Sequence, residues 1–252
     1  MTFHLSSTFA IAFVLALVRA SAWVTICPPF SSKGIPAMAK IGIALGIAFD
    51  AAGQLQHDPM PTSDAQIVTQ LVVQVGVGFL LGFVVSLFVS AIAAAGSLAD
   101  LFSGLNLPPS IDPLSQQQEP LFGQFYNLIT TALLFTTGAV LVIVQGFIHS
   151  FSAIGTTFPP TTLGSVTNVL IGDVTTFFAA AVEIAAPIIV VLFAAQVVLA
   201  LVAKATPQMN VFVFGFPLQI LLALAAVGMA LVALPAGVTN LVGRATTQLF
   251  GA

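Results

Sequence analysis

The chain has 252 residues, of which 58% are hydrophobic and only 5% are charged. Soluble domains carry about 25% charged residues, so this composition excludes a soluble protein of this length and predicts an integral membrane protein. The formal net charge of -3 comes from five basic and eight acidic residues. So few charges cannot form the basic patch that nucleic-acid binding requires.

The first two apolar segments each predict a membrane helix. Residues 8–27 are long enough to span a hydrocarbon core, which needs about 20 residues. Arg19 lies in the second half of this segment, and a cation at a helix centre costs about 2.5–3.5 kcal/mol. A snorkelling arginine and a partner-facing ion pair are both open interpretations. The second segment, residues 35–53, contains Gly42 and Gly46, whose spacing suits close helix contact.

The amino-terminal segment also carries a possible processing signal. Ala20-Ser21-Ala22 has the small-residue pattern of a signal-peptide cleavage site, but no Lys or Arg precedes the apolar run. We therefore expect residues 1–27 to be retained. Cys27 is the only cysteine, which excludes an internal disulfide and a thiolate metal site.

The next stretch, residues 65–99, contains no charge and is too long for one straight span. It predicts a long, tilted or broken helix, in which Gly78 and Gly82 are spaced for packing against a neighbour. The connection that follows, residues 96–123, has many helix breakers and predicts a loop. Apolar residues recur along it, which favours a loop packed inside an assembly over a solvated tether.

The second half of the chain predicts three further apolar helices, over residues 121–149, 169–203 and 218–242. The first is a helix or a bent pair, the second has a probable kink at Pro187, and the third bends at 235–237. A connection rich in Gly, Pro, Ser and Thr occupies residues 150–167. The pattern predicts an all-α integral membrane protein with about six main apolar helices, some broken or bent, in a single domain over residues 1–252.

Catalytic and metal-binding patterns are missing from the sequence. The histidines His4, His57 and His149 share no ligand spacing, and the glycine-rich stretches lack a phosphate-binding pattern. We expect no enzyme activity, no metal and no cofactor.

A secondary transporter is the main alternative, because transporters place lone carboxylates within helices. Glu183 is the best candidate for such a carboxylate, with Asp50 and Asp100 behind it. A carboxylate that pairs with a partner subunit, or stays protonated in the bundle, is the competing interpretation of Glu183.

The most specific stretch is Thr206–Pro217, a polar break between two apolar runs. Pro207 and Pro217 bracket it, and the amides of Gln208 and Asn210 can bond to backbone that no helix satisfies. Spacing alone favours an ordinary loop between helices. However, the string Pro-Gln-Met-Asn-Val-Phe followed by Gly-Phe-Pro resembles the signature of the FliR/SctT family of the type III export gate, in its flagellar form.

The resemblance extends in looser blocks over about residues 10–245. These blocks are the stretch around Arg19, Pro36 with Lys40-Ile41, the region from Ala95 to Gly104, Asp112-Pro113, Ser150-Phe151 and Pro187. Three positions depart from the family pattern. Gln74 stands where relatives commonly carry a glutamate, Gly138-Ala139-Val140 replaces a Gly-His pattern, and Lys204 replaces an arginine. These departures put in doubt any ion-pair role carried over to those positions.

The resemblance implies a helical-hairpin subunit of an export gate in the bacterial inner membrane, at the flagellar basal body. Such a subunit assembles with FliP and FliQ, contacts FlhB and membrane lipid, and forms a pore for unfolded flagellar substrates. The loop at residues 104–119 corresponds to the family's plug, and its apolar and proline residues would let it fill a pore and move aside.

The resemblance also assigns candidate roles to individual residues. The plug residues are Gly104, Leu105, Leu107, Pro108, Ile111, Asp112, Pro113 and Leu114. The signature residues expected to pack against other subunits are Pro207, Gln208, Asn210, Phe212, Gly215, Phe216 and Pro217. Intramembrane ion pairs are expected at Arg19, Asp100 and Glu183.

Overall fold

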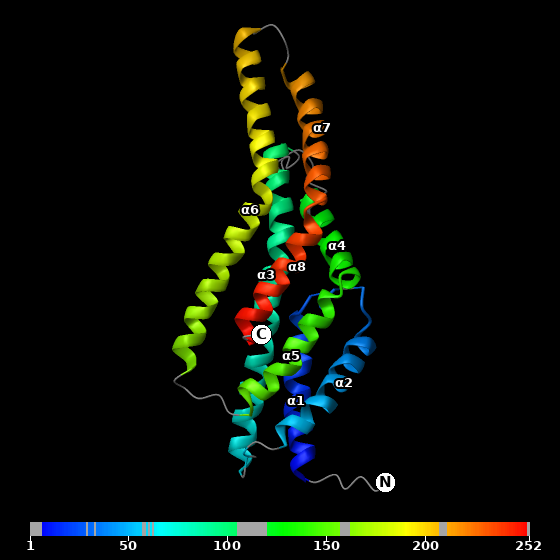
Figure 1. The fold of residues 1–252 in the computed structure, drawn as a ribbon, viewed down its shortest axis with the longest axis vertical. Helices are drawn as coiled ribbons and strands as arrows, with labels where there is room; N and C mark the ends of the chain where they lie inside the picture. Colours follow the sequence, from blue (N-terminus) through cyan, green and yellow to red (C-terminus); the bar gives the residue numbers. More distant parts are fainter. Residues whose placement is uncertain are drawn as a thin grey trace, which may run out of the picture. The chain divides into compact units, whose positions relative to one another are not determined.

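Every regular element that the structure describes is an α-helix, which confirms the all-α prediction. The computed structural model describes residues 7–28, 30–32, 34–56, 59, 61, 63–104, 120–156, 162–206 and 211–250. Figure 1 shows its helices, which are α1 (Ser7–Ile26), α2 (Ala37–Leu55), α3 (Asp64–Ser103), α4 (Leu121–Thr136), α5 (Ala139–Ile154), α6 (Thr162–Ala205), α7 (Val211–Leu231) and α8 (Leu234–Phe250).

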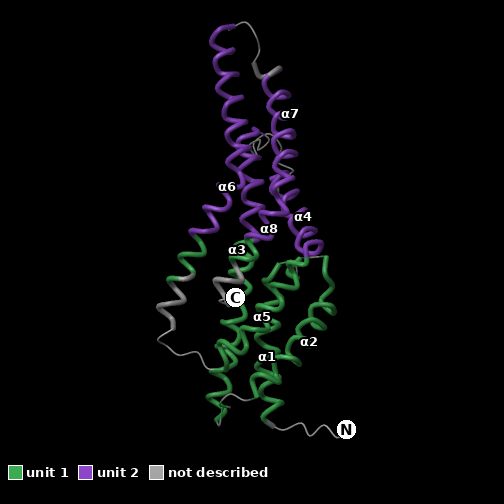
Figure 2. The backbone as a smooth tube through the Cα atoms, viewed as in Figure 1, with its two compact units in different colours: residues 1–88, 138–174, 241–252 green, residues 89–137, 175–240 purple. Residues whose placement is uncertain are grey.

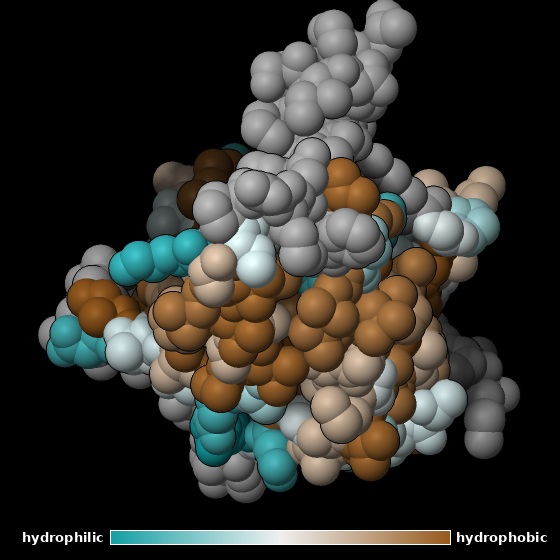
Figure 3. Space-filling view, turned by 90° about the horizontal axis from the view of Figure 1, so that it is seen from above, coloured by the Kyte–Doolittle hydropathy of each residue, from teal (hydrophilic) through white to brown (hydrophobic). Residues whose placement is uncertain are grey.

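The described helices are long and apolar enough for a multi-pass membrane protein. Four of them, in α1, α2, α3 and α6, meet the length and hydropathy of a membrane span. The pairs α4 with α5 and α7 with α8 are each bent at a short break, and counting each pair as one span gives up to six. This agrees with the expected six apolar helices with bent segments. Figure 3 shows apolar side chains spread over one face of the molecule, as contact with lipid or other subunits requires.

The described chain divides into two compact units, shown in Figure 2. Unit 1 comprises residues 1–88, 138–174 and 241–252, and unit 2 comprises residues 89–137 and 175–240. Helices α3, α6 and α8 contribute residues to both. The expectation of a single membrane domain over residues 1–252 stays a prediction.

Unit 1 is organised around α1, which packs closely against α3. A Cβ atom on Gly78 would collide with the carbonyl oxygen of Arg19, and one on Gly82 would lie 3.1 Å from that of Trp23. At Gly78 only glycine allows this backbone approach, and at Gly82 the contact is tighter than usual, so the predicted packing role of these two glycines is confirmed. The Trp23 indole stacks on the Phe147 ring of α5 at 4.2 Å between centroids. The same close approach is missing at Gly42 and Gly46, where a Cβ would meet nothing within 4 Å in the described chain.

Two connections between helices are shorter in the structure than the sequence predicts. Helix α3 continues through Ser103, although a loop was expected from residue 96. Gly96, the first residue of the segment that the pattern predicts to be a loop, instead serves as a contact point for α4 inside a continuous helix. In the connection expected over residues 150–167, α5 extends through Ile154 and α6 begins at Thr162.

The break around the signature stretch is also shorter than expected, because α7 begins at Val211 and contains Pro217. A proline inside a helix removes one backbone hydrogen bond, but membrane helices tolerate this loss. The predicted bend at 235–237 is shifted as well. The break lies at Val232-Ala233, and Pro235 falls in the first turn of α8. Backbone N–H groups in the first turn have no acceptor within the helix, so a proline there breaks no helical hydrogen bond.

Candidate functional site at the two ends of a connection

The best-defined polar site in unit 2 lies where α3 ends and α4 begins. We call it the loop base, and it consists of Asp100, Phe102, Gly104, Gly123, Gln196 and Gln219. Residues 105–119 connect its two sides and lie outside the described residues. Both sides of the base belong to unit 2. The base therefore shows how the helix ends on either side of the predicted plug are held.

The carboxyl end of α3 is capped by two amide side chains from other helices. The last carbonyl groups of a helix have no partner within it. The carbonyl oxygen of Phe102, in the last turn of α3, accepts a hydrogen bond from Nε2 of Gln196 in α6 at 2.8 Å. It accepts a second from Nε2 of Gln219 in α7 at 3.1 Å. Three helices are thus tied together at one carbonyl.

The amino end of α4 is capped from α3. Pro120 occupies the N-cap position of α4 and forms no side-chain cap. Asp100, whose side chain is fully buried, accepts the backbone N–H of Gly123 at its Oδ2 atom, 3.0 Å away. A carboxylate at a helix amino terminus is stabilised by the helix dipole and by the free N–H groups. Asp100 therefore supplies to α4 the cap that proline cannot.

Two glycines allow the helices to approach closely enough for this cap. A Cβ atom on Gly96 would lie 2.7 Å from the carbonyl carbon of Phe122 and 2.9 Å from Cα of Gly123. A Cβ on Gly123 would lie 2.5 Å from Oγ of Ser97. At Gly96 the contact is backbone against backbone, so a larger residue has no room there, whereas a Cβ on Gly123 would meet the hydroxyl group of Ser97.

The start of the connection meets part of the signature stretch. Gly104 follows α3 with a φ of 74°, a left-handed conformation typical of glycine after a helix end. A Cβ on Gly104 would lie 3.7 Å from Oε1 of Gln219 and 4.0 Å from a ring carbon of Phe216. Gly104, at the start of the predicted plug, therefore lies close to Phe216 of the signature stretch.

Replacing both Gln196 and Gln219 with leucine is expected to destabilise unit 2. The change leaves the Phe102 carbonyl without its two donors, at a cost of about 1–3 kcal/mol for a buried unpaired group. Each single variant keeps one donor and should lose less than half as much. The thermal midpoint of the purified protein in detergent measures this difference. If the stability losses of the two single variants add up to the loss of the double variant, the two amides do not share an acceptor.

A second polar centre lies in unit 1 around Arg19. The guanidinium is fully buried. Its Nε donates to Oε1 of Gln74, and its terminal nitrogens donate to the carbonyl oxygens of Ser150, at 3.2 Å, and Gly155. Nε2 of Gln74 donates in turn to the carbonyls of Gly155 and Thr156, each at 3.3 Å. Arg19 also lies 4.3 Å above the Phe151 ring centre.

This centre caps the carboxyl end of α5. Gly155 lies just beyond the last turn of α5 and Ser150 just before that turn; carbonyls at a helix end lack partners, and the helix dipole there favours a cation. The position of Gln74, noted as a departure from the family pattern, is therefore next to Arg19. An amide there can both accept from the guanidinium and donate to the helix end, whereas a carboxylate can only accept.

The other expected ion-pair residues lie in different places. Asp100 belongs to the loop base of unit 2 and Glu183 is exposed on α6. The ion pairs proposed for these residues and Arg19 stay predictions. Asp173 was missed by the sequence reasoning, although it is buried at 1% exposure and its Oδ2 has no hydrogen-bond partner among the described residues.

Several predicted site residues fall outside the described residues. They are Leu105, Leu107, Pro108, Ile111, Asp112, Pro113, Leu114, Pro207, Gln208 and Asn210. Phe212 lies in α7, where its side chain is not described; Gly215 is buried, and Phe216 and Pro217 are exposed. Within the described ranges, no three His, Cys, Asp or Glu side chains are grouped to hold a metal.

Comparison with known proteins gives one family. The family model of bacterial export proteins, family 1, matches residues 10–245. The flagellar biosynthetic protein FliR of Bacillus subtilis (strain 168) is 29% identical over 211 residues, covering 83% of this chain and 82% of the relative. FliR of Escherichia coli (strain K12) is 26% identical and covers 81% of this chain and 78% of the relative.

The similarity also reaches a second group of relatives. The surface presentation of antigens protein SpaR of Shigella flexneri is 28% identical over 135 residues, which is 52% of this chain and 50% of the relative. The match of the family model covers both polar centres described above. The chain therefore belongs to the bacterial export proteins, family 1.

Proposed function

We propose that this chain is a membrane subunit of a flagellar type III protein export gate. In this role it assembles with FliP- and FliQ-like subunits, contacts an FlhB-like subunit, and forms part of a pore in the bacterial inner membrane. Unfolded flagellar proteins pass through this pore. The family match and the relatives named flagellar biosynthetic protein support the assignment to the export apparatus, whose subunits of this family are structural proteins and not enzymes.

One observation supports the proposal that the connection over residues 105–119 acts as a plug: the helix ends on either side of it are fixed by the caps of the loop base. Asp100 holds the start of α4, and Gln196 and Gln219 hold the end of α3. Because the helix ends are fixed, the connection can change its conformation without unfolding the helices that carry it. Its apolar residues suit a water-filled pore that must be closed at rest.

Replacing residues 107–117 with a glycine-serine segment of equal length is the experiment that tests the plug. The segment keeps the chain length and removes the apolar side chains that would close the pore. We expect the complex to assemble normally and the membrane to become leaky to ions, measured as conductance in planar bilayers or as ion efflux from vesicles. Normal conductance in a fully assembled complex would refute the plug.

The alternative of a secondary transporter has less support. It relies on Glu183, which is exposed on α6, whereas transporter carboxylates face a bundle interior or an enclosed cavity. The buried carboxylate of Asp100 is already used to cap α4. Export that continues in a Glu183→Gln variant would agree with the gate proposal.

A further inference from the structure

One face of α6 in unit 2 carries a charged side chain that has no partner in the described part of the chain. Glu183 is exposed, and no hydrogen bond or ion pair joins it to another described residue. It lies well inside the candidate span Leu170–Ala205. The nearest charged residues along the helix are Asp173 and Lys204, several turns away. A carboxylate inside an apolar span is costly unless another group pairs with it.

The backbone carbonyl of Glu183 adds a second acceptor at the same place. In an α-helix this carbonyl accepts the N–H of the residue four positions later, which here is Pro187. Proline has no N–H, so the Glu183 carbonyl lacks its regular helical donor. Pro187 is exposed as well, and the four-residue spacing places it on the same face as Glu183. This face therefore requires an occupant that brings several hydrogen-bond donors.

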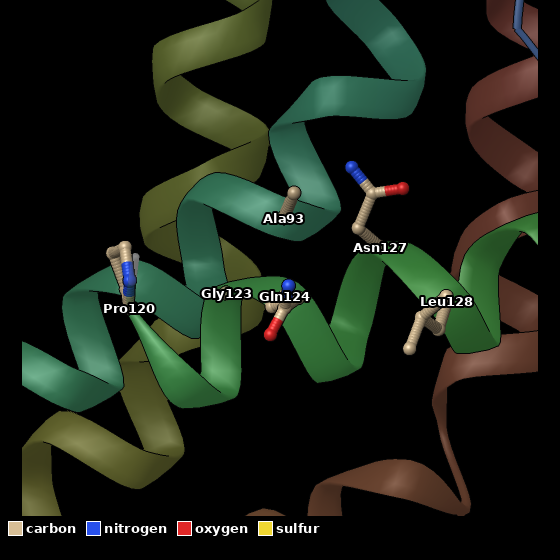
Figure 4. Close-up of a pocket in the computed structure, with 6 residues that line it drawn as sticks. All are labelled: Ala93, Pro120, Gly123, Gln124, Asn127 and Leu128. Atoms are coloured by element: carbon tan, nitrogen blue, oxygen red, sulfur yellow. The ribbon is translucent and has the colours of Figure 1, made fainter. Parts of the chain in front are cut away.

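The groove between α3 and the first turns of α4, also in unit 2, lacks such a charge. Figure 4 shows this groove, whose polar side chains are the amides of Gln124 and Asn127. None of its six lining residues is charged. Neutral amides do not select the charge of a partner, whereas the carboxylate of Glu183 selects a cation.

A cationic side chain on another membrane helix satisfies both acceptors at Glu183. Arginine has five N–H donors, lysine has three, and neither has an acceptor. A lipid tail has no donor, and the backbone N–H groups of a neighbouring helix are already bonded within that helix. Ala179 and Val190 are exposed and share the face of Glu183. A small residue next to the carboxylate allows a second helix to approach closely.

From these features we infer that this face of α6, defined by Ala179, Glu183, Pro187 and Val190, binds a membrane helix of a neighbouring gate subunit. That helix carries an arginine or lysine at the depth of Glu183, which bonds to the carboxylate and the free carbonyl. The inference rests on the proposed function, since it requires assembly with other subunits, and it adds the chemistry of one partner. Because the pair joins two chains, Glu183 stabilises the complex and not this chain alone.

Charge reversal at Glu183 tests this inference in the co-expressed complex. With Glu183→Lys, the share of complex that stays intact on heating in detergent should fall by about tenfold, because a hydrogen-bonded charge pair becomes a repulsion. Glu183→Gln keeps a neutral acceptor and should lose less. Neither change should lower the thermal midpoint of this chain purified alone. Asp64→Asn changes an exposed carboxylate in the first turn of α3 and is the matched control, which should leave the complex intact.

Photo-crosslinking identifies the helix that occupies this face. A benzophenone amino acid is placed at Val190, which is 65% exposed, or at Phe178, which is 63% exposed on another side of α6. We expect Val190 to form adducts with an apolar segment of a neighbouring subunit that contains arginine or lysine, and Phe178 to form none with that segment. Replacing that cation with glutamate should then restore the complex of the Glu183→Lys variant.

Four results would overturn the inference in a chain that still co-purifies with its neighbouring subunits, so that the proposed function stands. The first is a Glu183→Lys complex as resistant to heating as the unchanged one. The second is an equal loss of stability in this chain purified alone. The third is Val190 adducts only with lipid, with the exported polypeptide or with a second copy of this chain. The fourth is a charge swap that restores nothing. If the unchanged chain co-purifies with no neighbouring subunit, the proposed function fails and the inference fails with it.

Discussion

An Arg19→Leu variant is expected to lower the stability of unit 1. The guanidinium is fully buried and donates to Gln74 and to the carbonyls of Ser150 and Gly155. Leucine removes the donors and leaves these acceptors in place, although the Gly155 carbonyl keeps its bond from Gln74. A buried acceptor that loses its partner costs about 1–3 kcal/mol, so the total loss should be about 1–3 kcal/mol. The variant no longer has to bury a cation, which offsets part of this loss. A change would be neutral only if it removed the acceptors together with the guanidinium.

Trp23 provides a direct readout of this loss. It is the only tryptophan, and it stacks on Phe147 one helical turn from Arg19. Thermal unfolding followed by its fluorescence in detergent should show a lower midpoint for Arg19→Leu. Arg244→Leu removes an exposed arginine and is the matched control, with an expected change within about 0.5 kcal/mol. Equal midpoints for the two variants would show that Arg19 is not a structural cap.

The second large effect is expected for Gly96→Ala. The added Cβ would lie 2.7 Å from the carbonyl carbon of Phe122 and 2.9 Å from Cα of Gly123. Because both atoms belong to backbone, no side chain can turn away, and α4 must shift. Overpacking of this kind costs about 1–3 kcal/mol or more. The shift would also lengthen the hydrogen bond from the N–H of Gly123 to Asp100.

Gly76→Ala is the control for this substitution, because it lies in the same helix and its Cβ would meet nothing within 4 Å. There alanine should be neutral or stabilising by up to about 1 kcal/mol, since glycine is the poorer helix former. The fraction of monodisperse protein after heating, measured by size-exclusion chromatography, compares the two. A Gly96→Ala variant as stable as Gly76→Ala would disprove the close contact between α3 and α4.

The sequence predicted which segments form helices better than it predicted the residues at which those helices begin and end. Long apolar runs identified the candidate membrane spans among the described residues, because hydropathy over about 20 residues is a strong signal. The predicted ends differ from the observed ones where a glycine or proline favours a break but the helix continues through it. Gly96 lies inside α3 and Pro217 inside α7. At both positions local propensity is weaker than the stabilisation that a continuous apolar helix gains within its surroundings.

The polar centres were only partly predictable. Arg19 and Asp100 were noted because a charge in an apolar run is conspicuous. Their partners include backbone carbonyls of α5 and a backbone N–H of α4, and main-chain groups leave no trace in a sequence. Gln196 and Gln219 were missed, although single amides within long apolar helices are a usable signal for hydrogen bonds between helices.

One structural rule connects both centres. In water, the free groups at a helix end are solvated, but within an apolar assembly another helix has to supply their partners. Arg19 and Gln74 do this for α5, Asp100 for α4, and the two glutamines for α3. The helices of each unit are thereby held at their ends, and the connection proposed as a plug starts and finishes at such fixed points.

The central claim, that this chain is a subunit of an export gate, is tested most directly by its native mass with its partners. The tagged chain is expressed with its FliP- and FliQ-like neighbours, purified in detergent and measured by native mass spectrometry. We predict a stable hetero-oligomer that contains a single copy of this chain. A monomer or homodimer that leaves both neighbours behind would contradict the claim.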